Sequence, residues 1–255
     1  MNGEKRKRKK KIVRFRRKNS RVYKIGGFVL LVVVTLFILM LTPIFNAKWI
    51  DIKGNEKVSG GEIKTAISYY QGMNIFRLNL PKAEKNLLKI PYVETAEVHR
   101  KLPDGIRVTI TERVPVAYIK TGGSFMLCDK TGRILEQVKK IETPLAQIIG
   151  APTDGLKVGQ NLGDKSEEAQ RAYTVLYEKL NEYQLFDRVS GIDVKNPYLL
   201  SFMFDGNKTV VIGDGYRLDY KFMMLQATIE DLAPSEKGTI NLTVEGKAIF
   251  TPAEE

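Results

Sequence analysis

The sequence predicts an α+β protein with a single N-terminal transmembrane helix, then a β-α-α-β-β domain, then a mixed, β-rich domain with two helices. Three observations predict this class. An uncharged, mostly apolar stretch follows a dense basic tail. Four later segments repeat apolar residues at helical spacing, and the segments between them alternate apolar and polar residues. The expected parts are a basic cytoplasmic tail (1–24), a transmembrane helix (25–47), a first domain (48–113), a β domain (114–251) and a short C-terminal tail (252–255).

The basic tail accounts for the whole net charge of the chain. Residues 1–24 contain 13 Lys or Arg and one acidic residue, so their net charge is +12. The full chain is also +12, and residues 25–255 therefore carry 28 basic and 28 acidic side chains. A folded part without net charge lacks the electrostatic attraction that nucleic-acid binding needs, so we expect no nucleic-acid partner. A basic flank is typical of the cytoplasmic side of a span, where it attracts anionic lipid of the inner leaflet.

The apolar stretch from Ile25 to Ala47 is long enough to cross a bilayer, since about 20 helical residues span the ~30 Å hydrocarbon core. Residues 28–45 include fourteen Leu, Ile, Val or Phe, and such residues favour insertion. The stretch is longer than the apolar region of a signal peptide, and no small-residue cleavage site follows it. We therefore expect an uncleaved single span in the cell membrane, with the N-terminus cytoplasmic and the C-terminal domains outside.

The segment from Trp49 to Arg113 has the pattern β-α-α-β-β. Ile50 and Ile52 alternate with charged residues, which predicts a strand. Ser59 precedes Glu62 at the spacing of a capping box, which predicts the start of a helix. The two expected helices each show one apolar face, formed by Ile63, Ala66, Ile67 and Tyr70 in the first and by Leu80, Ala83, Leu87 and Leu88 in the second.

Two strands and a tight turn complete this first domain. Residues 93–100 form the second predicted strand, and the alternation from Ile106 to Thr111 predicts the third. Between them, the sequence Leu102-Pro103-Asp104-Gly105 predicts a turn. Proline presets φ in such a turn, and we expect Gly105 to take a positive φ.

From Val114 onward the patterns are mainly those of β-strands. The predicted strands are 116–119, 125–128, 145–149, 191–194, 198–204, 209–212, 240–244 and a last extended run, 247–250. One predicted helix follows Asp164, and another spans about 217–232. Their apolar faces contain Ala169, Ala172, Tyr173, Leu176 and Leu180 in the first and Leu218, Phe222, Leu225 and Ile229 in the second.

A search for catalytic chemistry finds no site. His99 is the single histidine of the chain and lies on a predicted strand, where a solvent-facing side chain is the simpler interpretation. Cys128 is the single cysteine and lies in an apolar run, which favours a buried, unreactive thiol. One histidine and one cysteine do not make a zinc site, and no phosphate-binding, dinucleotide or nucleophile-elbow motif is present. We therefore predict no catalytic, cofactor-binding or metal site.

The order of these segments resembles the FtsQ/DivIB family of bacterial cell-division proteins, whose first outer domain is a POTRA domain. The residues that carry the likeness in the first half are Ile50-Asp51-Ile52-Lys53-Gly54-Asn55, residues 91–98, Leu102-Pro103-Asp104-Gly105 and residues 111–117. Those in the second half are Val211-Ile212-Gly213, Lys221 and Ile240-Asn241-Leu242. The likeness covers essentially the whole chain. Asn241 replaces the Asp that is usual in this family, which keeps a hydrogen-bonding side chain and removes a charge.

The resemblance implies a non-enzymatic scaffold of the division septum, without a cofactor, that helps to control septal peptidoglycan synthesis. The implied partners are FtsB/DivIC-like and FtsL-like coiled-coil division proteins and the septal peptidoglycan synthase complex. The main contact in the family is the last strand, which accepts a partner strand at the edge of the sheet. The expected partner-binding residues are Val244, Gly246, Lys247, Ala248, Ile249 and Phe250, with Arg217 and Lys221 on the preceding helix available for acidic partner residues.

Alternatives remain open at this point. A membrane-tethered cell-wall or surface enzyme would use a site that the sequence does not reveal. A transport-type POTRA protein would need several such domains and a C-terminal barrel of alternating strands, and we find one domain and no such series. The run 247–250 also fits an ordinary edge strand, and Ile240, Leu242 and Val244 also fit core positions.

Overall fold

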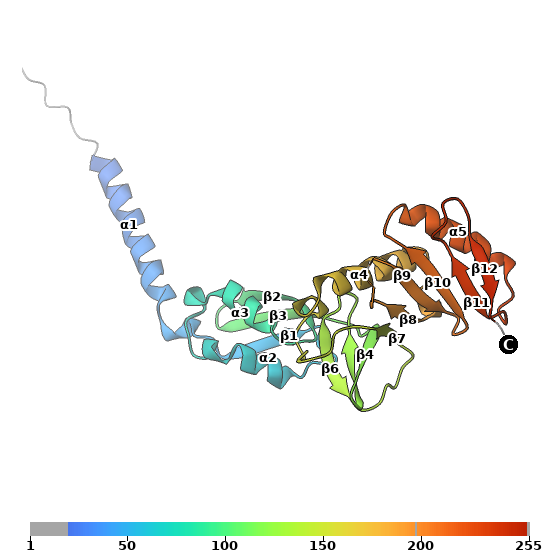
Figure 1. Ribbon diagram of the computed structural model, residues 1–255. Coiled ribbons are helices and arrows are strands. Elements are labelled where there is room, and N and C mark those ends of the chain that lie inside the picture. Colours follow the sequence, from blue (N-terminus) through green and yellow to red (C-terminus); the bar gives the residue numbers. More distant parts are fainter. Residues whose placement is uncertain (1–19, 197, 254–255) are drawn as a thin grey trace, which may run out of the picture.

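The computed structural model describes residues 20–196 and 198–253. Most of the predicted basic tail, 1–24, therefore lies outside the described residues. Along the described chain, one isolated helix is followed by two domains in a row (Figure 1). The C-terminus lies at the end of the molecule farthest from that helix, and the row of domains runs at a steep angle to the helix axis (Figure 1).

Helix α1 (Ser20–Met40) stands apart from both domains, and protein buries none of its apolar window, Tyr23–Met40. Within the described residues it is the one helix that is long and apolar enough to cross a membrane. It ends earlier than the predicted span, 25–47, because the next element, the 3-10 helix η1 (Pro43–Phe45), begins with proline. The residue before a proline disfavours helical dihedral angles, and Thr42 is accordingly extended.

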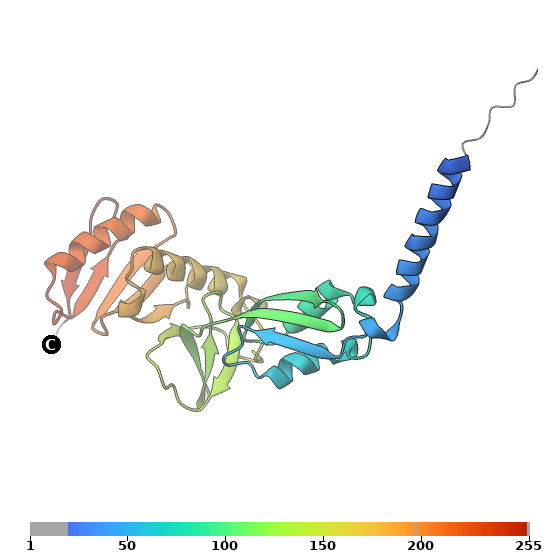
Figure 2. The ribbon, with the colours of Figure 1, turned by 180° about the vertical axis from the view of Figure 1, so that it is seen from behind.

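The first domain has the predicted β-α-α-β-β order. Its elements are β1 (Trp49–Lys53), α2 (Gly60–Ala66), η2 (Ser68–Tyr70), η3 (Ile75–Arg77), α3 (Leu80–Leu87), β2 (Val93–Lys101) and β3 (Gly105–Glu112). The strand order is β1-β3-β2, with β1 parallel and β2 antiparallel to β3 (Figure 2). The Ser59 hydroxyl accepts a hydrogen bond from the Glu62 N–H at 3.1 Å, which confirms the predicted start of α2.

Three details of the first domain differ from the prediction. The first helix ends at Ala66, so Tyr70, expected on its apolar face, lies in the 3-10 helix η2. Leu88, predicted on the buried face of α3, is the residue that ends this helix and is 39% exposed. Gly105 does not have the predicted positive φ. Glycine is needed there for a different reason, because a Cβ at this position would overlap the ring of Trp49 on the neighbouring strand.

The second domain is built on one nine-stranded mixed sheet with the strand order β12-β11-β10-β9-β8-β7-β4-β5-β6. Its strands are β4 (Ala117–Thr121), β5 (Ser124–Cys128), β6 (Ile134–Val138), β7 (Ala146–Ile149), β8 (Val189–Asp193), β9 (Leu200–Phe204), β10 (Lys208–Gly213), β11 (Gly238–Asn241) and β12 (Ile249–Pro252). Its helices are η4 (Leu162–Asp164), α4 (Glu167–Glu182), η5 (Phe186–Arg188) and α5 (Leu218–Asp231).

Helices α4 and α5 both lie on the β domain's sheet, and the end of α4 meets the start of α5 (Figure 1). Lys179 on α4 forms an ion pair with Asp219 on α5, and the rings of Tyr183 and Phe222 are 5.3 Å apart. The predicted apolar faces of both helices join the core of this domain. Along β9 and β10, buried and more exposed residues alternate, as expected when one face of a sheet is packed and the other is solvated.

Strand β6 is not among the predicted strands, and its burial explains why. Its first two residues are both fully buried, but in different cores: Ile134 in the core of the β domain and Leu135 in the core of the first domain. A strand that is buried on both sides lacks the alternation by which we recognised the others. The strand joins the two domains, because one of its faces completes the first domain.

Polar contacts reinforce this junction. The Glu136 carboxylate on β6 accepts hydrogen bonds from the Lys57 ammonium at 2.5 Å and from the Tyr92 hydroxyl at 2.6 Å. Arg113, at the end of the first domain, donates to the buried Asp129 carboxylate at 2.5 Å. The domains are therefore held together by an apolar contact at Leu135 and by two ion pairs.

Candidate functional site

A sheet offers its unpaired backbone groups at its two outer strands, which are β6 and β12 in the β domain. The β6 edge is covered at its start. Ile134 donates to the Gln160 carbonyl and accepts from the Gly159 N–H, both at 2.8 Å, so a loop pairs with the start of the strand. The side chain of Glu136, near the middle of β6, contacts the first domain. At Ile134 this edge therefore has no backbone group left to offer.

The β12 edge is free in the part of the chain that the structure describes. β12 pairs antiparallel with β11, and no described strand pairs with its other side. Ala253 donates to the Lys237 carbonyl at 2.9 Å. Because hydrogen-bonded and non-hydrogen-bonded pairs alternate along an antiparallel ladder, Thr251 and Ile249 also face β11, and Phe250 turns its N–H and C=O outward. Pro252 turns only a C=O outward, because it has no N–H.

The residues expected to bind a partner occupy two different kinds of position. The strand covers Ile249–Pro252 and so begins two residues later than the predicted run, 247–250. Val244 and Gly246 belong to the turn before it, in which the Lys247 N–H donates to the Val244 carbonyl at 3.2 Å. Val244 is exposed, so it does not fill the core as Ile240 and Leu242 do.

Side chains on β12 divide between the core and solvent. Phe250 and Ala248 are partly buried and pack against the core of the β domain. The Phe250 ring lies over Gly238 on β11, where a Cβ would overlap it. Ile249 points away from that core and is 43% exposed. The free edge therefore combines an outward backbone with one freely available apolar side chain.

A hollow of about 150 Å³ lies between the start of α5 and the turn that leads from β11 into β12. It brings together both predicted helix residues, Arg217 and Lys221, with the turn residues Val244 and Gly246. The sequence did not predict that these residues lie together, because their proximity depends on the parallel pairing of β10 with β11. The site is thus an edge strand with an adjoining hollow.

The two basic residues already have acidic neighbours in the same chain. Arg217 donates to Glu245 at 3.0 Å, and its guanidinium lies 4.7 Å from the centre of the Tyr220 ring. Both members of the Arg217–Glu245 pair are well exposed, so the pair contributes only about 0–1 kcal/mol and can exchange for a partner's carboxylate. Lys221 differs, because its side chain is largely buried and donates to the Asp214 carboxylate at 2.9 Å. The ammonium of Lys221 holds the pKa of Asp214 below its usual value.

Three large residues at this end of the molecule were absent from the predicted site. Tyr216, Tyr220 and Met223 are exposed beside or on α5, and two of them line the hollow or its rim. They do not belong to the apolar face that packs into the core. Their position off the buried face of the helix is the sequence signal that could have identified them. Aromatic residues, Met and Arg are also the types enriched in protein interfaces.

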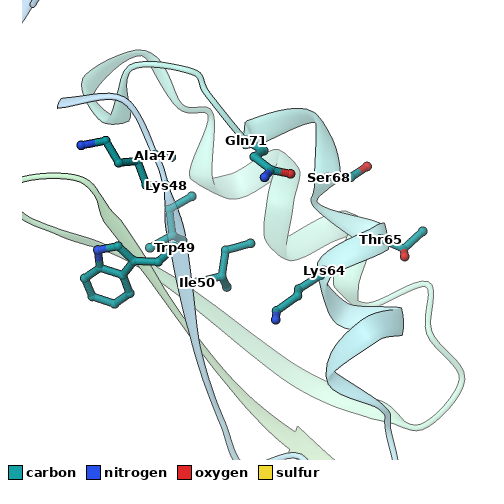
Figure 3. Close-up of a pocket in the computed structure, with 9 residues that line it drawn as sticks. Ala47, Lys48, Trp49, Ile50, Lys64, Thr65, Ser68 and Gln71 are labelled. Atoms are coloured by element: carbon teal, nitrogen blue, oxygen red, sulfur yellow. The ribbon is translucent and has the colours of Figure 1, made fainter. Parts of the chain in front are cut away.

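Another hollow, of about 420 Å³, lies between β1 and α2 in the first domain (Figure 3). Lys64 and Gln71 turn toward Ile50 across it (Figure 3).

The described residues contain no group of three or more His, Cys, Asp or Glu that could hold a metal ion. His99 is exposed, as predicted, and its ring lies 3.5 Å from Glu97. Cys128 is buried, as predicted, and burial raises the pKa of its thiol.

Comparisons with known proteins match both domains. The family model for the POTRA domain, FtsQ-type, matches residues 45–113, and the model for the C-terminal domain of cell division protein FtsQ/DivIB matches residues 117–244. The chain is 26% identical to cell division protein DivIB of Clostridium botulinum, over 93% of this chain and 94% of the relative. It is 27% identical to DivIB of Clostridium acetobutylicum, over 82% and 84% of the two chains. It is 41% identical to cell division protein FtsQ of Koribacter versatilis over 87 residues, which are 34% of this chain and 25% of the relative.

Proposed function

Because this chain belongs to the FtsQ/DivIB family of cell-division proteins, we propose that it is a membrane-anchored scaffold of the division septum that binds other division proteins through the free edge of β12. Members of this family are non-enzymatic division proteins. This membership argues against a tethered cell-wall enzyme. In this proposal the scaffold helps to control septal peptidoglycan synthesis by holding its partners together.

The contrast between the two ends of the nine-stranded sheet carries this proposal. A free edge is a liability unless it is covered or has a partner. At β6 a loop pairs with the start of the edge and the first domain packs against the strand, whereas within the described residues β12 has neither. A partner strand added to β12 would gain main-chain hydrogen bonds from Phe250 and would choose its register by side chains. The hollow beside Arg217 would receive a side chain of that partner, with Tyr220 and Val244 as its apolar walls.

The partners in this proposal are FtsB/DivIC-like and FtsL-like coiled-coil division proteins and, through them, the septal peptidoglycan synthase complex. Helix α1 anchors the chain, with the N-terminus in the cytoplasm and both domains outside. The tail before α1, which lies outside the described residues, contacts anionic lipid of the inner leaflet. No nucleic acid takes part, since the chain beyond the tail has no net charge.

A pair of substitutions at Phe250 tests whether the backbone of β12 binds the partner. Phe250→Ala removes the ring but keeps the outward N–H, whereas Phe250→Pro removes both. Proline is tolerated on an edge strand where the N–H faces outward. Losing one hydrogen bond to a desolvated partner carbonyl costs about 1–3 kcal/mol, or about 5- to 150-fold in affinity. We expect Phe250→Pro to bind the DivIC-like partner at least 5-fold more weakly than Phe250→Ala in co-purification from membranes. Equal binding by the two variants would rule out strand addition at this edge.

A further inference from the structure

The end of helix α1 is fastened to the first domain by hydrogen bonds and has no free linker. The Asn74 side-chain amide donates to the carbonyl of Met40, the last residue of α1, at 2.8 Å. Asn46 forms an isolated β-bridge with Asn74. Ala47 donates to the Met73 carbonyl at 2.8 Å and accepts from the Gly72 N–H at 2.9 Å. The turn at residues 71–74 therefore lies directly against the exit of the helix.

The depth of this turn follows from the length of α1. The 18-residue apolar window Tyr23–Met40 is about 27 Å long as a helix, close to the ~30 Å thickness of a hydrocarbon core. When α1 spans a bilayer, the Met40 carbonyl lies near the outer boundary of that core. Asn74 is one hydrogen bond away from this carbonyl. The turn at 71–74 must then lie at the level of the outer headgroups.

The residues exposed at this level suit a lipid surface. Leu41, Ile44 and Met73 are all at least 40% exposed, although they are apolar. Segments 41–50 and 68–83 contain no carboxylate side chain. They hold Lys48, which pairs with Asp104 at 3.0 Å, and also Arg77 and Lys82. Apolar groups flanked by cations are stabilised where acyl chains meet phosphates.

We infer that Leu41, Ile44 and the turn at 71–74, which we call the juxtamembrane surface, dock on the outer leaflet of the bilayer that α1 crosses. This inference rests on the proposed anchoring of the chain by α1. The docked surface and the Asn74–Met40 hydrogen bond hold the first domain in one orientation against the membrane. Because ion pairs and Leu135 join the two domains, this orientation extends to the β domain.

A label at position 73 tests the inference in the full chain, reconstituted in vesicles of phosphatidylcholine and phosphatidylglycerol at a 3:1 ratio. Met73→Cys and Met223→Cys are a matched pair, since both methionines are exposed (40% and 62%) but Met223 lies on α5, in the other domain. The native Cys128 is buried and its thiol pKa is raised, so a maleimide fluorophore reacts with the new thiol. Nitroxide-bearing lipids should quench the label at 73 several-fold more than the label at 223. Equal quenching would overturn the inference.

Flotation of the same vesicles separates this result from a failure of the anchor. A chain that does not float with lipid is not anchored by α1, which would overturn the proposed anchoring together with this inference. A chain that floats but shows equal quenching would overturn only the docking. The same lipids should also quench the fluorescence of Trp49, the single tryptophan of the chain, without any substitution. Trp49 follows Ile44 of the juxtamembrane surface by a few residues.

Asn74→Asp tests how the orientation is held. The Asn74 side-chain oxygen accepts from the Phe76 N–H at 3.0 Å, and aspartate keeps this contact. Aspartate cannot donate to the Met40 carbonyl, and it adds a negative charge at the leaflet. We expect this variant to float normally and to lower the quenching at position 73 toward the value at position 223. Unchanged quenching would overturn the role that we assign to the hydrogen bond.

Discussion

At Glu112, the last residue of β3, one carboxylate holds a whole loop of the first domain. It accepts backbone hydrogen bonds from Glu56 at 3.0 Å and from Lys57 and Val58 at 2.8 Å each. Burial acts to raise the pKa of Glu112 and is the largest single influence. The three N–H groups together outweigh it, and the pKa is lowered. Protonation of Glu112 therefore weakens the attachment of this loop.

We expect Glu112→Gln to flatten the acid side of the stability curve. A carboxylate whose pKa is lower in the folded state stabilises the fold above its unfolded pKa, about 4.3. This contribution is lost as the pH falls through the folded pKa. The wild-type chain should therefore lose more free energy of unfolding between about pH 5 and pH 3 than Glu112→Gln, although the variant is less stable at pH 7. Urea unfolding in detergent, followed by Trp49 fluorescence, measures both curves. Parallel curves would contradict the assignment.

Predictions for single residues were right where the residue's role depends on a neighbour along the chain. They were wrong where the role depends on a residue that is distant in the sequence. The Ser59 cap depends on Glu62, three residues away, and the structure confirms it. Gly105 depends on Trp49, which the parallel pairing of β1 with β3 brings alongside. No local pattern reveals that pairing. The sequence shows that residue 105 is glycine, and the structure shows why a Cβ does not fit there.

At the scale of elements, the strongest prediction concerns β12 and the strands beside it. Ile249 on β12 and Met203 on β9 are a matched pair of exposed apolar residues, at 43% and 40%. Ile249→Asp should reduce capture of the partner by at least 10-fold, because a charge would be buried beside the added strand. Met203→Asp, which lies three strands inside the edge, should capture normally. Co-purification from membranes measures both, and near-UV circular dichroism checks that each variant is folded. Loss of capture by both variants would indicate a binding surface on the sheet face and not at its edge.

The periodicity of apolar residues predicted the helices and most strands, but it did not predict the residues at which they begin and end. Both helices of each domain form where an apolar face repeats at helical spacing. The start of β12 was wrong by two residues, because the turn at 244–246 is followed by two residues that extend without joining the ladder. Predicting that Arg217 and Val244 line the same hollow would also have required knowledge of the β10–β11 pairing. A candidate site made of one strand edge could be predicted, but the hollow beside it could not.

At the scale of the whole molecule, Leu135 joins the folding of the two domains. It lies on β6 of the β domain but is 1% exposed within the core of the first domain. Leu135→Ala should destabilise the first domain by about 2–5 kcal/mol, because it opens a cavity there. Leu88→Ala, at a position that is 39% exposed, serves as the control and should change stability much less. Hydrogen exchange of the first domain measures the effect. Faster exchange confined to the β domain would contradict the shared core.

The place of β12 at the end of the row of domains farthest from α1 has a consequence for the proposed partner (Figure 1). Because the row runs at a steep angle to the helix axis, β12 is displaced sideways from the point at which α1 leaves the bilayer (Figure 1). A membrane-anchored partner that binds at β12 therefore has its own anchor at a lateral distance from α1 and not packed against it.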